Sequence, residues 1–243
     1  MPASDVAPSV AARSSAVRVA AVVLVVVIAL VVPPVLVVNA LRVLATDTFV
    51  RFEYDRDGFP ADRYGLTRDQ REALALTGLD SIQPGSDGIV LLERATLPDG
   101  TQSFDARELA HMEDVRTLFG AALRAQLVTV LVVVVLALVL GRTRLRVAVP
   151  RGLLAGALAT LAIAVLAVPF ILLGFDRFFT RFHEMFFEGD SWRFSSTDTL
   201  IRLYPERFWE DVSQLAAAIT VAQAVVLALV AWWWLRAARR RAA

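Results

Sequence analysis

Two histidines, His111 and His183, are the side chains in this sequence best suited to proton transfer near neutral pH. Each lies in one of two long polar stretches that separate apolar segments. His183 belongs to the stretch Phe175–Trp209, which holds 11 of the 22 aromatic residues. Because most of the remaining sequence is apolar, we expect the two imidazoles to transfer protons on a lipidic substrate beside a bilayer.

The acidic neighbours of His111 could control its protonation. Glu108, His111 and Asp114 are spaced i, i+3 and i+6, so a helix would place them on roughly one face. Either carboxylate could hold the imidazole in one tautomer. About 10 Å of helix separates His111 from Leu118, which predicts that the ring lies just above the membrane surface. The alternative is an exposed helical face on which charged side chains form ion pairs.

The aromatic stretch around His183 predicts a lined pocket for acyl chains or glycerol. An interfacial belt of aromatic rings is the alternative, but a belt needs only a few rings. The residues that we expect to line the pocket are Phe182, Phe186, Phe187 and Phe208. Further candidates for binding substrate or orienting the histidines, besides Glu108 and Asp114, are Asp190, Trp192, Asp198 and Tyr204.

The composition excludes several kinds of chemistry. The sequence contains no Lys and no Cys, which rules out Schiff-base lysines, Ser–Lys dyads, thiol nucleophiles and disulfides. It has no G-x-S-x-G motif and no Gly-rich phosphate loop. Metal ligation is suggested only by a Glu-x-x-His spacing that is common by chance, so we expect no metal and no cofactor. We also expect no nucleic-acid partner, and the sequence indicates no oligomeric state.

Four segments are long and apolar enough to cross a bilayer about 30 Å thick. Only a helix satisfies the backbone of such a segment in lipid, so their Val-rich composition does not indicate strands. The mid-membrane positions carry no charged side chain, which argues against a transporter or channel. The predicted transmembrane helices are residues 19–41, 118–141, 152–175 and 212–235.

Arginine placement predicts the orientation. The connection 142–151 has four Arg and no acidic residue, and further arginines flank the first and last spans. These segments should be cytoplasmic, with both termini inside. The predicted cytoplasmic segments are thus 1–18, 142–151 and 236–243, and the predicted outer loops are 42–117 and 176–211. We expect a protein of the cell (cytoplasmic) membrane with an extracytoplasmic active face.

The two outer loops predict a small α+β cap, so the expected fold is a mainly α membrane protein with four spans and this cap. Expected strands are Phe49–Tyr54, Ile89–Ala95 and Thr101–Phe104, the last two flanking a turn at Leu97–Gly100. Thr67 and Gln70 form a capping box for a helix that should end at Gly78. Asp105 and Glu108 should cap a helix that runs into the second span.

The chain resembles a family of four-span bacterial membrane proteins that includes the lipoprotein intramolecular transacylases. The resemblance covers nearly the whole chain and rests on two blocks. The first is Glu108-x-x-His111-Met112-x-Asp114-Val115. The second comprises Phe182-His183-x-x-Phe186-Phe187, Trp192 and Asp198-x-x-Ile201-x-x-Tyr204-Pro205-x-x-Phe208.

The resemblance implies an acyltransferase that acts within one diacylglyceryl-modified lipoprotein. An acyl chain would move from the glycerol sn-2 ester to the α-amino group of the N-terminal cysteine, with His111 and His183 as catalytic residues. Membrane lipids and such lipoproteins would then be the partners. We expect His183 to act as base and a protonated His111 as acid or oxyanion stabiliser. The alternatives are a non-catalytic protein that binds lipid or lipoprotein, and a hydrolase that releases free fatty acid.

Overall fold

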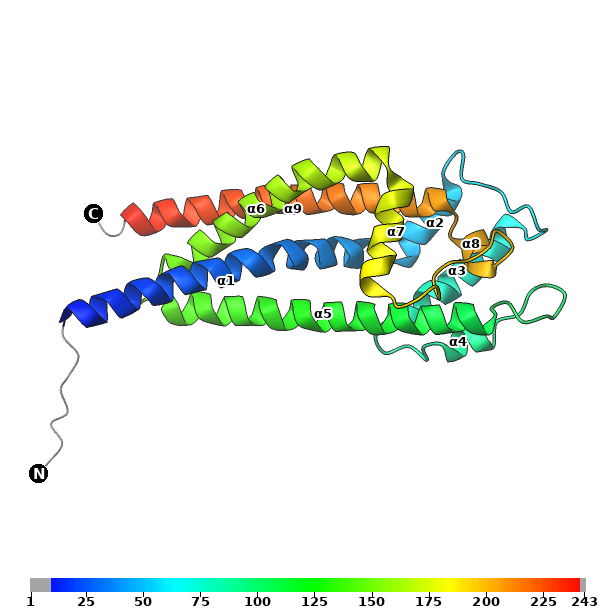
Figure 1. The fold of residues 1–243 in the computed structure, drawn as a ribbon, viewed down its shortest axis with the longest axis horizontal. Helices are drawn as coiled ribbons and strands as arrows, with labels where there is room; N and C mark the ends of the chain where they lie inside the picture. Colours follow the sequence, from blue (N-terminus) through cyan, green and yellow to red (C-terminus); the bar gives the residue numbers. More distant parts are fainter. Residues whose placement is uncertain (1–9, 241–243) are drawn as a thin grey trace, which may run out of the picture. The chain divides into compact units, whose positions relative to one another are not determined.

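The structure, a computed structural model, describes residues 10–240, and the regular secondary structure of these residues is helical (Figure 1). Parts of the two predicted tails, residues 1–9 and 241–243, lie outside the described residues. The helices in chain order are α1 (Val10–Leu44), α2 (Asp47–Asp55), α3 (Arg68–Ile82), α4 (Val90–Glu93), α5 (Ala106–Leu140), α6 (Ala148–Leu173), α7 (Phe175–Phe186), α8 (Thr199–Leu203) and α9 (Glu206–Arg240).

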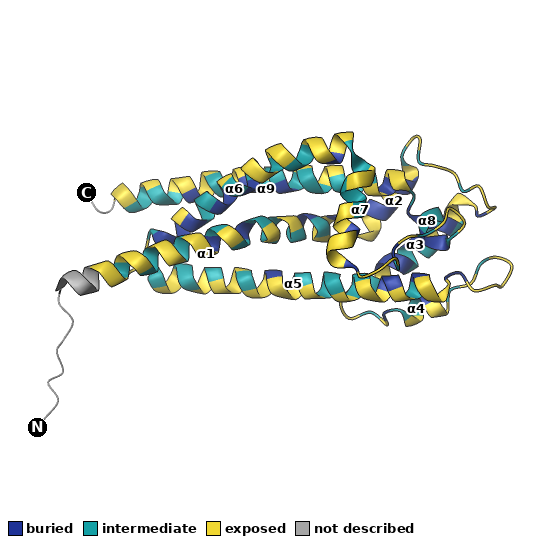
Figure 2. Ribbon diagram, in the orientation of Figure 1, coloured by how far each residue is buried: buried dark blue, intermediate teal, exposed yellow. Residues whose placement is uncertain are grey.

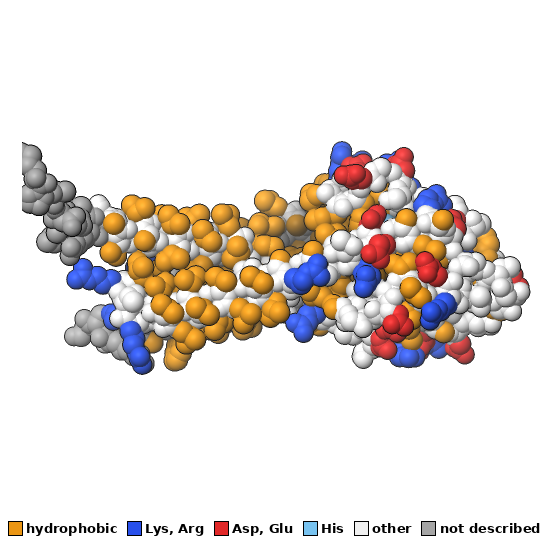
Figure 3. Space-filling model, turned by 90° about the horizontal axis from the view of Figure 1, so that it is seen from below, with side chains coloured by type: hydrophobic (Ala, Val, Ile, Leu, Met, Phe, Trp, Pro, Cys, Tyr) orange, Lys and Arg blue, Asp and Glu red, His pale blue; other side chains and the backbone are white. Residues whose placement is uncertain are grey.

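Four of these helices, α1, α5, α6 and α9, are long and apolar enough to cross a membrane. Hydrophobic side chains cover the apolar lengths of the long helices, whereas charged side chains gather over the part formed by the short helices (Figure 3). The prediction of four spanning helices is thus confirmed in their number, length and apolar composition. Within α5 every charged residue except Arg124 precedes position 118, so we take residues 118–140 as its membrane-spanning segment.

The chain divides into two compact units. Among the described residues, one unit comprises 10–36, 127–164 and 220–240, and its core includes Ile28, Val32 and Val149. Within this unit α6 approaches α1 closely at two glycines four residues apart. A Cβ on Gly152 would lie 2.6 Å from Ile28 Cβ, and one on Gly156 would lie 2.6 Å from Val32 Cβ. Small residues at this spacing allow membrane helices to pack backbone against backbone.

The other unit comprises residues 37–126 and 165–219, and it contains both histidines. Buried residues are concentrated in its short helices and in the first turns of α5 (Figure 2). Its apolar core brings together side chains from both predicted loops. They include Phe49, Tyr54, Leu92, Phe104, Leu203, Tyr204 and Phe208.

The predicted β structure of the cap is wrong. Residues 49–54 lie in α2, and residues 90–93 form the single turn α4. In α2 the buried positions Phe49, Val50, Glu53 and Tyr54 follow helical spacing, while Phe52 is 53% exposed. The alternation of apolar and charged residues therefore misled the prediction, because a short amphipathic helix gives a similar pattern over six residues. Pairing near residues 101–104 is limited to one isolated bridge between Thr96 and Gln102.

The local signals at helix starts and at the turn are confirmed. Thr67 and Gln70 form both hydrogen bonds of a capping box, and so do Asp105 and Glu108 across the start of α5. The predicted turn is closed by a hydrogen bond of 2.9 Å from Gly100 N to Leu97 O.

Gly78 does not end α3, as the sequence predicted, but lies inside it. A glycine is needed inside the helix because Tyr204 packs against it. A Cβ at this position would lie 2.5 Å from Tyr204 Oη. The same hydroxyl donates a hydrogen bond of 2.5 Å to Ala75 O. Gly78 thus gives the phenol ring room to lie against α3, and this contact joins the two predicted loops.

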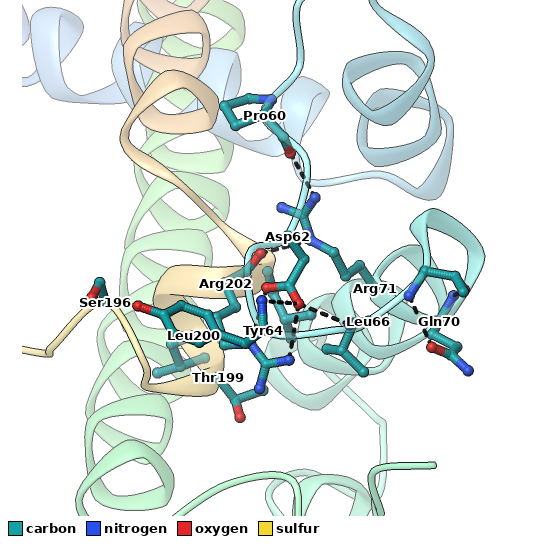
Figure 4. Close-up of polar contacts among 12 residues, drawn as sticks. Pro60, Asp62, Tyr64, Leu66, Gln70, Arg71, Ser196, Thr199, Leu200 and Arg202 are labelled. Carbon is teal, nitrogen blue, oxygen red and sulfur yellow. Dashed lines mark hydrogen bonds and ion pairs between the residues drawn. The ribbon is translucent and has the colours of Figure 1, made fainter.

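Polar contacts also join these loops (Figure 4). The carboxylate of Asp62 accepts two hydrogen bonds from Arg202, at 3.0 and 3.1 Å. Although partial burial opposes ionisation, these bonds and those from two backbone N–H groups hold the Asp62 pKa at about 2. Arg71 is 3% exposed, and its guanidinium donates to Arg202 O at 2.8 Å and to Pro60 O at 2.6 Å.

We expect Gly78→Ala to destabilise the protein through its clash with the Tyr204 hydroxyl, by about 1–3 kcal/mol as in other overpacked cores. In a Tyr204→Phe background the same change should be neutral or stabilising, because Ala favours helix by about 1 kcal/mol once the hydroxyl is gone. Thermal unfolding of the four detergent-solubilised variants measures both effects. An equal loss in both backgrounds would contradict the assigned contact.

Candidate active site

The two histidines, which are 72 positions apart in the sequence, face each other in the folded chain. His111 extends from the second turn of α5 and His183 from the third turn of α7. Their ring centroids are 6.1 Å apart and the ring planes are inclined by 24°. Both side chains are buried, each in a residue that is 8% exposed. The pair is therefore largely removed from water.

Aromatic rings enclose the pair. Phe187 touches both imidazoles, with its centroid 5.0 Å from His111 and 5.4 Å from His183. Phe179 and Trp192 pack on His183 at 4.0 and 4.9 Å, and Phe194 meets His111 edge to face at 5.4 Å. The surroundings of the pair are thus apolar.

A backbone contact selects the tautomer of His183. Its Nδ1 lies 2.8 Å from Phe179 O, one turn earlier in α7. A carbonyl oxygen only accepts hydrogen bonds, so Nδ1 must carry the proton. In the neutral ring Nε2 is then unprotonated and can act as a base.

Three polar atoms in the site or next to it in sequence have no hydrogen-bond partner among the residues that the structure describes. They are His111 Nδ1, Trp192 Nε1 and Ser191 Oγ, and all three are buried. Buried polar atoms are nearly always satisfied, so exceptions call for a specific explanation such as a bound molecule. His111 Nδ1 and Trp192 Nε1 belong to rings that pack at the imidazole pair, so both atoms could bond to a molecule bound there.

Burial makes both imidazoles weak bases. His111 precedes the membrane-spanning part of α5, and burial, aided by the nearby His183, lowers its pKa to about 4. Burial also lowers the pKa of His183, against the opposing effect of its bond to Phe179 O. The resting site at neutral pH therefore holds two neutral rings, which differs from the expectation of one protonated histidine.

Glu108 is 2% exposed, and its described hydrogen bonds go to the backbone rather than to His111. One carboxylate oxygen accepts from Asp105 N at 2.8 Å and the other from Leu200 N at 2.7 Å. The side chain therefore joins the start of α5 to the start of α8. It thus fixes the helix that carries His111 through backbone contacts.

Asp198 positions the segment that carries Phe194. Its Oδ2 accepts from Ser195 N and from Arg107 Nη2, both at 2.7 Å. The Arg107 guanidinium in turn lies 5.1 Å from the Phe194 ring centroid. Through these contacts α5 holds Phe194 against the histidine that the same helix supplies.

The other predicted site residues lie in different places. Asp114 is exposed, and Asp190 is exposed and pairs with Arg193 at 3.2 Å. Tyr204 and Phe208 pack against each other in the apolar core at 5.1 Å. Phe182 contacts His183 at 5.6 Å but is 38% exposed, and Phe186 packs on Phe182.

Two rings of the site, Phe179 and Phe194, are absent from the residues predicted from the sequence. Helical periodicity identifies Phe179, because it precedes His183 by four positions on the same face of α7. No sequence signal identifies Phe194, whose position depends on a contact with Arg107 that is distant in sequence.

The fold and the site define a polytopic helical membrane protein with an enclosed pair of imidazoles. The family model described as "Lipoprotein intramolecular transacylase Lit" matches residues 22–209. An uncharacterised protein of Aquifex aeolicus is 31% identical over 179 residues, which is 74% of this chain and 79% of that protein. The chain belongs to the lipoprotein intramolecular transacylase (Lit) family and is a multi-pass membrane protein.

Solved structures have the same fold. The membrane-integral lipoprotein intramolecular transacylase Lit of Bacillus cereus superposes with a TM-score of 0.70 at 16% identity, over 90% of this chain and 98% of that chain. A variant of that protein with one histidine replaced by arginine gives a TM-score of 0.69 at 16% identity, over 96% and 100% of the two chains. A variant with alanine instead gives 0.64 at 16% identity, over 90% and 96%.

The lowered pKa of His111 predicts a pH dependence of stability. Between pH 6.5 and about 4 the unfolded chain binds a proton at this residue and the folded chain does not. The free energy of unfolding therefore has its full value, as far as His111 is concerned, above pH 6.5. It decreases as the pH falls toward 4, by up to about 3 kcal/mol. The melting temperature of purified wild type should therefore fall more steeply from pH 7 to 4.5 than that of His111→Phe. Equal slopes would contradict the burial of a neutral imidazole.

Proposed function

We propose that the protein is an acyltransferase that moves an acyl chain within a diacylglyceryl-modified lipoprotein. The chain would pass from the glycerol sn-2 ester to the α-amino group of the N-terminal cysteine and leave a lyso-form product. The observation that carries this proposal is the buried imidazole pair, with ring centroids 6.1 Å apart inside an aromatic enclosure. Membership of the Lit family supports the same reaction.

His183 is the base in this mechanism. Its Nδ1 proton is held by Phe179 O, so Nε2 is the nitrogen that receives a proton from the attacking amine. As the carbon–nitrogen bond forms, the ester carbon–oxygen bond breaks and the glycerol oxygen takes the proton that His183 Nε2 received from the amine. Proton uptake and release balance, so the two imidazoles need no outside acid or base.

His111 and Trp192 are suited to stabilise the negative charge that develops on the ester carbonyl oxygen. A neutral imidazole and an indole can each donate an N–H hydrogen bond. Trp192 Nε1 is buried without a described partner beside His183, as is Nδ1 of His111. Donors that are already desolvated and held in place stabilise such a charge without further reorganisation.

An intramolecular transfer suits the residues that the chain contains. The reaction needs no nucleophile from the protein, and the sequence has neither Cys nor Lys. The contribution of the protein is to hold the amine and the ester together, which can lower the barrier by about 7–11 kcal/mol in well-oriented reactions. The rings of Phe179, Phe187 and Phe194 exclude water and pack the lipid part of the substrate.

The proposed orientation places both termini in the cytoplasm and the histidines on the outer side of the cell membrane. Its support is the positive-inside rule, since Arg142, Arg144 and Arg146 are exposed in the short connection between α5 and α6. Diacylglyceryl-modified lipoproteins would then meet the site from the outer leaflet.

A non-catalytic protein that binds lipid or lipoprotein is the second candidate. The observation that favours it is the 8% exposure of both histidines, which suits structural rings as well as catalytic ones. In that case removal of either imidazole would change stability or binding without any loss of product.

We expect His111→Ala and His183→Ala each to lower production of the lyso form by at least about 100-fold, since acid–base groups contribute about 10²–10⁴. Mass spectrometry of lipoprotein N-termini, from cells that depend on each variant, measures the product. Glu113→Gln, an exposed change two residues from His111, is the matched control and should be fully active. Normal product from either histidine variant would contradict the mechanism, and release of free fatty acid by wild type would indicate a hydrolase instead.

A further inference from the structure

Helix α7 has a second functional face, turned away from the imidazole pair. His183 and Phe179 lie on one side of the helix, whereas Arg177, Arg181 and Glu184 lie on the opposite side and are exposed. The change of direction between α6 and α7 occurs at Gly174, whose backbone angles (φ −152°, ψ 47°) are not helical. This elbow is where apolar membrane sequence gives way to charged sequence.

Two adjoining cavities of about 440 and 320 Å³ lie at the elbow. The first is lined mainly by polar residues of α7, including Arg177 and Thr180. The second is lined by the apolar end of α6, where Leu166 and Leu173 are 79% and 89% exposed. Phe170 and Arg177 line both cavities, so the charged residues of α7 adjoin an apolar compartment at the end of α6.

Arg177 is the unpaired cation of this groove. Its neighbour Arg181 is neutralised by Glu184 at 2.9 Å, and the Asp176 carboxyl interacts with the carboxyl of Glu206. Arg177 itself makes no ion pair within residues 10–240. It lies within about one turn of the last apolar residue of α6, the depth at which lipid headgroups meet a membrane helix.

We propose that the α6–α7 elbow binds a glycerophospholipid, with the phosphate on Arg177 and an acyl chain along Phe170, Leu166 and Leu173. Guanidinium groups pair closely with phosphate oxygens, and the exposed leucines need an apolar partner. This site is separate from the imidazole pair and does not depend on acyl transfer. Its ligand fixes the helix that carries His183 to the surrounding bilayer.

The headgroup distinguishes this ligand from the proposed substrate. A diacylglyceryl-modified lipoprotein carries no phosphate on its glycerol, whereas the Arg177 guanidinium at the elbow lacks an anionic partner. Phosphate is therefore the chemical group that decides occupancy. Phosphatidylglycerol and phosphatidylethanolamine should both bind, and diacylglycerol should not.

Native mass spectrometry of the detergent-solubilised full chain tests the proposal with added phosphatidylglycerol, phosphatidylethanolamine or diacylglycerol. We expect Arg177→Gln to weaken binding of both phospholipids about tenfold, the loss of one charge-assisted contact. Arg63→Gln is the matched control, because Arg63 is also exposed and without a described ion pair but lines neither cavity. Phe170→Ala should weaken phospholipid binding through the apolar compartment.

Thermal unfolding of each variant without lipid confirms that it is folded. Equal phospholipid binding by Arg177→Gln and Arg63→Gln would overturn the proposal, as would diacylglycerol binding as tight as that of the phospholipids. Competition by a diacylglyceryl lipopeptide would also overturn it, since the elbow would then belong to the substrate path. Because the measurement involves no catalysis, its outcome is independent of the proposed transferase activity.

Discussion

The contact between two buried imidazoles is the constraint on which the rest of this structure depends. A ring pair with centroids 6.1 Å apart, shielded by Phe187, Phe179, Trp192 and Phe194, remains neutral because water is kept away from it. A neutral ring can accept a proton at one nitrogen and donate a hydrogen bond from the other, whereas a protonated ring can accept none. The apolar enclosure and the chemistry are therefore aspects of one arrangement.

Contacts between elements distant in sequence hold this pair together. Glu108 joins the start of α5 to α8, and Asp198 holds Phe194 through Arg107. Further from the rings, Arg202 pairs with Asp62 in the first predicted loop. The carboxylates of Glu108, Asp198 and Asp62 each accept at least two hydrogen bonds at buried or half-buried positions. Such bonds restrict geometry more than they add stability. Together they make a single unit from two loops that the spanning helices separate in sequence.

Much of the fold follows from local sequence signals. The four spanning helices follow from apolar length, and the capping boxes at Thr67 and Asp105 mark helix starts because their hydrogen bonds are local. The strand predicted at 49–54 failed because six residues cannot distinguish period 2 from a short amphipathic helix. Gly78 looked like a helix end because its actual partner, Tyr204, is 126 positions away. At the site, the residue types identified the histidines, but the tautomer, the neutral state and the contact with Phe194 all depend on tertiary packing.

The most direct test of the central claim is nitrogen NMR of the protein labelled with ¹⁵N at histidine. Because the sequence contains two histidines, His111→Phe assigns the signals by difference. At pH 7 both rings should be neutral, with His183 protonated at Nδ1 and free at Nε2. An imidazolium signal from either ring at pH 7, or a His183 proton on Nε2, would contradict that claim.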